Sequence, residues 1–77
     1  MKIEILGMGC AKCRLLYENV QVAVRAAGIE AEVIKVETID KITGYGVMMT
    51  PALVIDGRVK SSGNVPSLQE IKKWLEK

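Results

Sequence analysis

The sequence lacks the features that mark membrane-spanning, secreted and nucleic-acid-binding proteins. No apolar run approaches the ~20 residues that a helix needs to cross a bilayer. The N-terminal stretch KIEIL has no basic segment leading a long apolar stretch and no small-residue cleavage site. The formal net charge of +2 is too small to indicate a nucleic-acid partner. We therefore expect a cytoplasmic protein that binds neither membranes nor nucleic acid.

The chain also lacks internal repeats, low-complexity segments and any interdomain linker. Its 77 residues predict a single domain over 1–77 and a monomer. The core should be thin, because a chain this short buries only about 60 to 65% of the surface that its unfolded form exposes. A hydrophobic content of 49% and a charged content of 26% are ordinary for a folded domain.

Cysteine is scarce, and both cysteines fall in the stretch GMGCAKC at residues 7–13. A purely structural disulfide is disfavoured in a reducing cytosol, so the C-x-x-C spacing indicates either redox catalysis or metal binding. Both uses need a glycine-softened turn that carries two thiols at the start of a helix. The loop by itself leaves the two interpretations open.

The first half of the chain predicts a strand, a helix and a second strand. KIEIL at 2–6 alternates apolar and charged residues, as a half-buried strand does. From 10 to 27 apolar residues recur at helical spacing, and Gly28 stands where a helix C-cap belongs. The segment 31–37 is rich in β-branched residues. These elements predict a right-handed βαβ unit with parallel strands.

The second half predicts a short helix over 38–43, a hairpin over 52–60 and a terminal helix. Asp56-Gly57 is the dipeptide that best supplies a tight type I′ hairpin turn. Ser67, with a glutamate three residues later, predicts a capping box at the last helix. That helix should turn three apolar residues toward the core, namely Leu68, Ile71 and Leu75. The predicted order is β-α-β-α-β-β-α.

The loop resembles the G-M-x-C-x-x-C ligand loop of heavy-metal-associated domains. Those domains run β-α-β-β-α-β, with a hairpin directly after the first helix and a strand at the end of the chain. Here the hairpin comes late and the chain closes with a helix, so the predicted order argues against such a domain.

A second motif is more specific. Thr50-Pro51 stands directly before the strand ALVI, where a proline is tolerated because its missing N–H falls outside the ladder. With the run Cys10 to Cys13 at the start of the first helix and Gly63 after the hairpin, the chain resembles the thioredoxin and glutaredoxin superfamily over its whole length. The closest resemblance is to the minimal small redox-active disulfide proteins. It implies an α/β thioredoxin-like fold, with a four-stranded mixed sheet and helices on both faces, and a cis-proline at Pro51.

The resemblance also implies a thiol-disulfide oxidoreductase whose cofactor is its own Cys10–Cys13 dithiol, with no bound metal. Cys10 is expected to be the nucleophile, because the unpaired N–H groups and the dipole at a helix N-terminus stabilise a thiolate. Cys13, one turn further into the helix, should be less exposed and act as the resolving thiol. The partners would be protein disulfides and an electron-donating reductase.

Substrate contacts are expected around the dithiol. In the superfamily the residue before the cis-proline pairs its backbone with the substrate, which assigns that role to Thr50. Lys12 would add a positive charge, and Gly63 is assigned to the substrate site by the resemblance. An apolar rim would come from Tyr45 and from methionines, which adapt to varied surfaces: Met8, Met48 and Met49.

Two rival functions remain at this point. One is a metallochaperone that binds Cu(I) or Zn²⁺ through Cys10 and Cys13, with Met8 as a soft third ligand. The other is a non-catalytic interaction module that keeps the fold.

Overall fold

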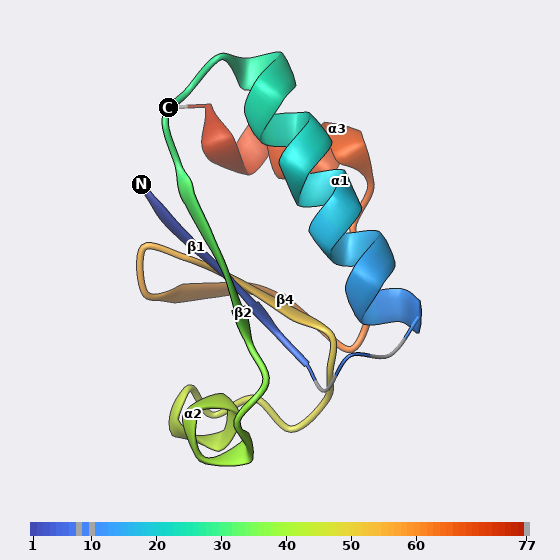
Figure 1. The fold of residues 1–77 in the computed structure, drawn as a ribbon, viewed down its shortest axis with the longest axis vertical. Coiled ribbons are helices and arrows are strands. Elements are labelled where there is room, and N and C mark those ends of the chain that lie inside the picture. Colours follow the sequence, from blue (N-terminus) through green and yellow to red (C-terminus); the bar gives the residue numbers. More distant parts are fainter. Residues whose placement is uncertain (8, 10, 77) are drawn as a thin grey trace.

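The computed structural model describes residues 1–7, 9 and 11–76, so the predictions for Met8 and Cys10 lie outside the described residues. The described part of the chain forms one mixed sheet with strand order β2-β1-β3-β4, flanked by helices on both faces (Figure 1). The elements in chain order are β1 (Lys2–Leu6), α1 (Ala11–Ala27), β2 (Glu32–Val36), α2 (Ile39–Gly44), β3 (Ala52–Ile55), β4 (Arg58–Ser62) and α3 (Leu68–Leu75). This order confirms the predicted α/β fold.

The βαβ unit forms as predicted. Strands β1 and β2 pair in parallel, from Lys2 opposite Glu32 to Leu6 opposite Val36, and α1 connects them. Gly28 ends α1 with a φ of 66°, and its N–H donates to the carbonyl oxygens of Val24 and Arg25. A side chain rarely tolerates this left-handed conformation, which explains the glycine.

The hairpin and the last helix also follow their local signals. Asp56 and Gly57 both have positive φ, at 49° and 83°, as a type I′ turn between β3 and β4 requires. Ser67 and Glu70 form the complete capping box at the start of α3.

The prediction that Leu68 faces the core is wrong. Ile71 and Leu75 are buried, but 39% of Leu68 is exposed. Leu68 is the first residue of α3, so no preceding helical turn covers it.

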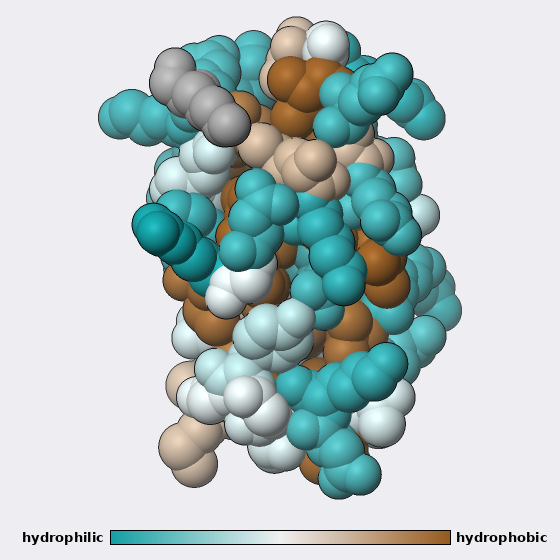
Figure 2. Space-filling model, turned by 90° about the vertical axis from the view of Figure 1, so that its left-hand side faces the viewer, coloured by the Kyte–Doolittle hydropathy of each residue, from teal (hydrophilic) through white to brown (hydrophobic). Residues whose placement is uncertain are grey.

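The two faces of the sheet carry separate cores. On one face α1 and α3 pack together over β1 and β3, as Figure 1 shows. On the other face α2 covers a smaller cluster that includes Leu6, Val36 and Ile42. On the face that Figure 2 shows, hydrophilic side chains cover most of the area, and hydrophobic ones appear in separate patches. Trp74 is partly buried and packs against the larger core.

Glu4 departs from the simple alternation predicted for β1. The residue is only 7% exposed, because α2 and the residue after it cover this face of the sheet. The Tyr45 hydroxyl donates a hydrogen bond of 2.6 Å to Glu4 Oε1, and the Lys2 ammonium lies 3.9 Å from the same oxygen. The hydrogen bond to Glu4, with burial and the nearby negative charge as smaller causes, raises the pKa of Tyr45 above its ordinary value.

The Tyr45–Glu4 contact should make stability depend on alkaline pH. Because the pKa of Tyr45 is higher in the folded than in the unfolded state, its hydrogen bond to Glu4 stabilises the fold fully below the unfolded-state pKa of about 10. This stabilisation is lost as the pH rises through the folded-state pKa. We expect the difference in unfolding free energy between wild type and Tyr45→Phe to shrink from pH 8 to pH 11 in urea titrations. Tyr17→Phe leaves the Tyr45–Glu4 hydrogen bond intact and is the control. A difference that stays constant with pH would contradict this account.

Candidate active site

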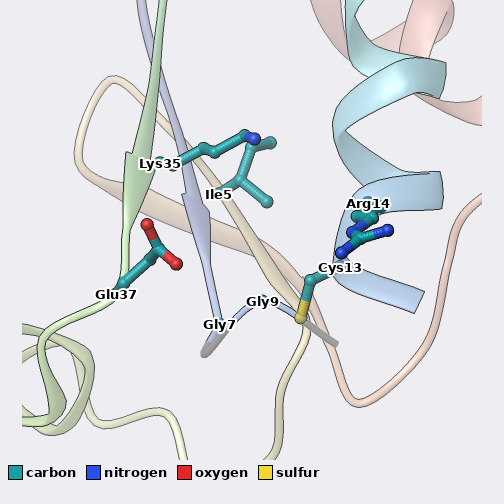
Figure 3. A pocket seen from close by; sticks show the side chains of 7 residues that line it. All are labelled: Ile5, Gly7, Gly9, Cys13, Arg14, Lys35 and Glu37. Carbon is teal, nitrogen blue, oxygen red and sulfur yellow. The ribbon is translucent and has the colours of Figure 1, made fainter. Parts of the chain in front are cut away.

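Cys13 lies in the first turn of α1, with 6% of its surface exposed. Its sulfur points toward the bend that follows β1 (Figure 3). A Cβ added to Gly7 would overlap Cys13 Sγ and lie 3.3 Å from Cys13 Cβ. The Cys13 sulfur therefore occupies the space that a side chain at residue 7 would need, and this explains the glycine at that position.

The same bend brings Pro51 to the cysteine. Pro51 Cα lies 3.9 Å from the point where a Gly7 Cβ would stand, and the proline side chain is fully buried. The Thr50–Pro51 peptide bond is cis. Because Leu6 pairs with Ala52 in the antiparallel register of β1 and β3, the residue before β3 must reach the end of β1. Residues far apart in the sequence thus meet at Gly7.

Gly63 and Met49 lie beside Pro51. The Gly63 N–H donates a 2.9 Å hydrogen bond to the Pro51 carbonyl oxygen. A Cβ on Gly63 would lie 3.1 Å from Met49 Cβ, and its φ of 80° also favours glycine. Met49 is 64% exposed, and Thr50 is exposed as well. The structure therefore groups Met49, Thr50 and Gly63 around the buried proline.

Other predicted site residues lie elsewhere. Tyr45 packs against the core cluster on the α2 face and directs its hydroxyl to Glu4, so it is not part of a rim at Cys13. That prediction was wrong because α2 holds Tyr45 over the middle of β1. Lys12 is exposed on α1, and Met48 is almost fully exposed.

A cavity that sequence reasoning missed opens beside Cys13. Its volume is about 330 Å³, and it is lined by Ile5, Gly7, Gly9, Cys13, Arg14, Lys35 and Glu37 (Figure 3). Two features of the sequence could have predicted that Arg14, Lys35 and Glu37 line a site. Arg14 follows Cys13 directly, and Lys35 and Glu37 stand at the carboxyl end of a strand parallel to β1. The carboxyl ends of parallel strands meet at one edge of a sheet.

Charge of both signs surrounds this cavity. Arg14 comes from α1, Lys35 from β2, and Glu37 follows β2 by one residue. The Lys35 ammonium is 4.3 Å from the ring centroid of Tyr17, within the range of a cation–π contact. Figure 3 shows the Lys35 side chain reaching across β1 and the Glu37 carboxylate on the β2 side.

Two further observations concern metals and membranes. Over residues 1–7, 9 and 11–76, no group of three or more acidic, cysteine or histidine side chains is arranged to hold a metal ion. No helix among these residues is long and apolar enough to span a bilayer.

The contact between Gly7 and Cys13 predicts a sharp steric effect. Gly7→Ala forces its Cβ onto the Cys13 sulfur and should destabilise the fold by about 1–3 kcal/mol, the usual cost of overpacking. Gly44→Ala is the matched control, because nothing lies within 4 Å of a Cβ at Gly44. Urea unfolding of both variants provides the measurement. Equal stability of Gly7→Ala and wild type would show that this contact does not constrain residue 7.

Comparison with known proteins agrees with this geometry. Residues 1–76 match the protein family described as "Thioredoxin domain". A protein named thioredoxin from Methanothermobacter thermautotrophicus is 45% identical over 75 residues, which cover 97% of each chain. Another protein named thioredoxin, from Methanocaldococcus jannaschii, is 42% identical over 74 residues, covering 96% of this chain and 85% of the relative. With a family match over nearly its whole length and these two relatives, the chain belongs to the thioredoxin domain family.

Proposed function

We propose that this protein is a thiol-disulfide oxidoreductase that reduces protein disulfides through Cys10 and Cys13. The observation that carries the proposal is the packing of Cys13 beside Pro51 at Gly7, in a chain of the thioredoxin domain family. The dithiol would be the only redox group, with no further cofactor or resident metal. A reducing cytosol is the compartment that suits such a dithiol.

Cys10 is the attacking thiol in this proposal. In the sequence it directly precedes Ala11, the first described residue of a helix of 17 residues. Unpaired N–H groups and the positive end of the dipole at a helix N-terminus favour an anion, and only a thiolate attacks a disulfide.

Cys13 is the resolving thiol. At 6% exposure it is closed to the disulfide of a bulky protein substrate, so its reaction is intramolecular. The Cys10 thiolate attacks one substrate sulfur, which forms a mixed disulfide and expels the other substrate sulfur as a thiolate. Cys13 then attacks Cys10 Sγ and expels the second substrate thiolate. The substrate gains two electrons, and the protein ends with a Cys10–Cys13 disulfide that a reductase must reduce.

The exposed residues beside Pro51 would receive the substrate chain. Thr50 and Met49 are open to solvent next to the buried proline, and Gly63 supports their loop through its hydrogen bond to Pro51. An extended substrate segment can pair with the backbone of Thr50 while Met49 adapts to its side chains. The proposal further includes Met8 in the apolar rim, Lys12 as a nearby positive charge and a surface for the reductase. These three assignments rest on the sequence.

Reduction of insulin disulfides tests the function. Wild-type protein supplied with dithiothreitol should accelerate insulin reduction with a chelator present, whereas Cys10→Ser and Cys13→Ser should lose essentially all of the acceleration. Without dithiothreitol, which would cleave the adduct, pre-reduced Cys13→Ser should accumulate a mixed disulfide with the substrate, because the resolving thiol is gone, and Cys10→Ser should accumulate little. Mass spectrometry after an acid quench measures the adducts.

The rival metallochaperone gives the opposite pattern. Competition of wild type against a calibrated chelator for Zn²⁺ and Cu(I) would then show tight binding, with no insulin turnover. That combination, or trapping through Cys13 in place of Cys10, would overturn the proposed function or its assignment of roles.

A further inference from the structure

The cavity beside Cys13 has a different lining from the loop proposed to receive protein substrates. Among the described residues its lining comes from β1, the bend after β1, α1 and the end of β2, and includes none of Met49, Thr50 and Pro51. Its volume of about 330 Å³ falls at the lower end of the ~300–1,000 Å³ typical of small-ligand pockets. It is therefore sized for a small molecule next to the resolving sulfur.

The cavity's charges are available to a ligand. Over the described residues Lys2–Glu4 is the one ion pair, so none of Arg14, Lys35 and Glu37 forms an ion pair with another described residue. Lys35 is held over the Tyr17 ring, on the side toward α1. Glu37 Oε2 lies beside the bend, 3.5 Å from the point where a Gly9 Cβ would stand. Cations and carboxylate thus line different sides of the cavity (Figure 3).

We propose that this cavity binds one half of a small amino-acid disulfide, of the class of cystine, and makes it a substrate of the dithiol. Arg14 and Lys35 fit the carboxylate of such a ligand, and Glu37 fits its ammonium group. A purely anionic ligand would bring a second negative charge toward Glu37, and a purely cationic one would face Arg14 and Lys35. The zwitterion alone matches both sides.

This inference rests on the proposed function, because it uses the same dithiol. The Cys10 thiolate attacks one sulfur of the ligand disulfide and expels one amino-acid thiolate. The other half, now joined to Cys10 through a mixed disulfide, occupies the cavity. Cys13, whose sulfur lines that cavity, attacks Cys10 Sγ and releases the second amino-acid thiolate. Both released thiolates take protons from the Cys13 thiol and solvent, so two electrons pass from the protein to the ligand.

A series of disulfides that differ only in charge tests the inference. Reduced protein is mixed with cystine, cystamine, 3,3′-dithiodipropionate or neutral bis(2-hydroxyethyl) disulfide at pH 7 and low salt, and its oxidation is followed by acid quench and alkylation. Each rate is divided by that of dithiothreitol with the same disulfide, which removes differences in leaving-group reactivity. We expect the highest normalised rate with cystine.

Charge-neutralising variants locate the effect. Arg14→Gln and Lys35→Gln should each lower the ratio of the normalised cystine rate to the neutral-disulfide rate by about two- to five-fold, as expected for exposed ion pairs. Glu37→Gln should lower that ratio and raise the ratio for dithiodipropionate. Arg25→Gln, an equal change of charge at an exposed position in the last turn of α1, is the matched control and should leave all ratios unchanged. The differences should shrink at 1 M salt, where charges are screened within about 3 Å.

The outcomes separate the two proposals. If the neutral disulfide oxidises the protein but cystine has no normalised advantage, or Arg14→Gln and Lys35→Gln behave like Arg25→Gln, the cavity does not select amino-acid disulfides and the oxidoreductase function stands. If no disulfide oxidises the dithiol, the proposed function fails and the inference fails with it. Each variant is judged by the ratio of its own rates with two disulfides. A smaller fraction of folded protein lowers both rates equally and leaves that ratio unchanged.

Discussion

The close packing of the Cys13 sulfur against the bend after β1 is the constraint on which the rest of the site depends. A Cβ at residue 7 would overlap this sulfur, so a larger residue there would force the Cys13 side chain or the bend to shift. This packing holds the first turn of α1 against the end of β1. The later turns of α1 are held against the sheet by their buried residues Leu16, Val20 and Ala23. A buried thiol such as Cys13 is suited to the second, intramolecular step of the disulfide exchange proposed above.

The strand order places a different strand on each side of the end of β1, next to the Cys13 sulfur. Because β1 lies between β2 and β3, Leu6 at its end pairs with Val36 on one side and with Ala52 on the other. The antiparallel neighbour brings Pro51 and its exposed loop to the bend, and the parallel neighbour brings Glu37. The two binding places proposed above, one for a protein chain and one for a small charged ligand, thus lie on the two sides of the end of β1.

The opposite face of the sheet is organised around a polar group. Glu4 is buried in the middle of β1, and the hydroxyl of Tyr45 satisfies one of its oxygens. A buried carboxylate needs such partners, because burial without them costs several kcal/mol, on the order of 2–7 for a neutral polar group and more for a charge. This requirement explains why Tyr45, which directly follows α2, directs its hydroxyl toward Glu4.

The sequence by itself determined the elements and the family pattern. Gly28, the Asp56-Gly57 turn and the Ser67 cap act through hydrogen bonds and backbone angles within a few residues, so their outcome does not depend on the rest of the fold. Tertiary structure alone decided which distant side chains meet. The grouping of Arg14 with Lys35 and Glu37, the partner of Tyr45 and the exposure of Leu68 all follow from how α1, α2 and α3 pack on the sheet, which no local pattern encodes.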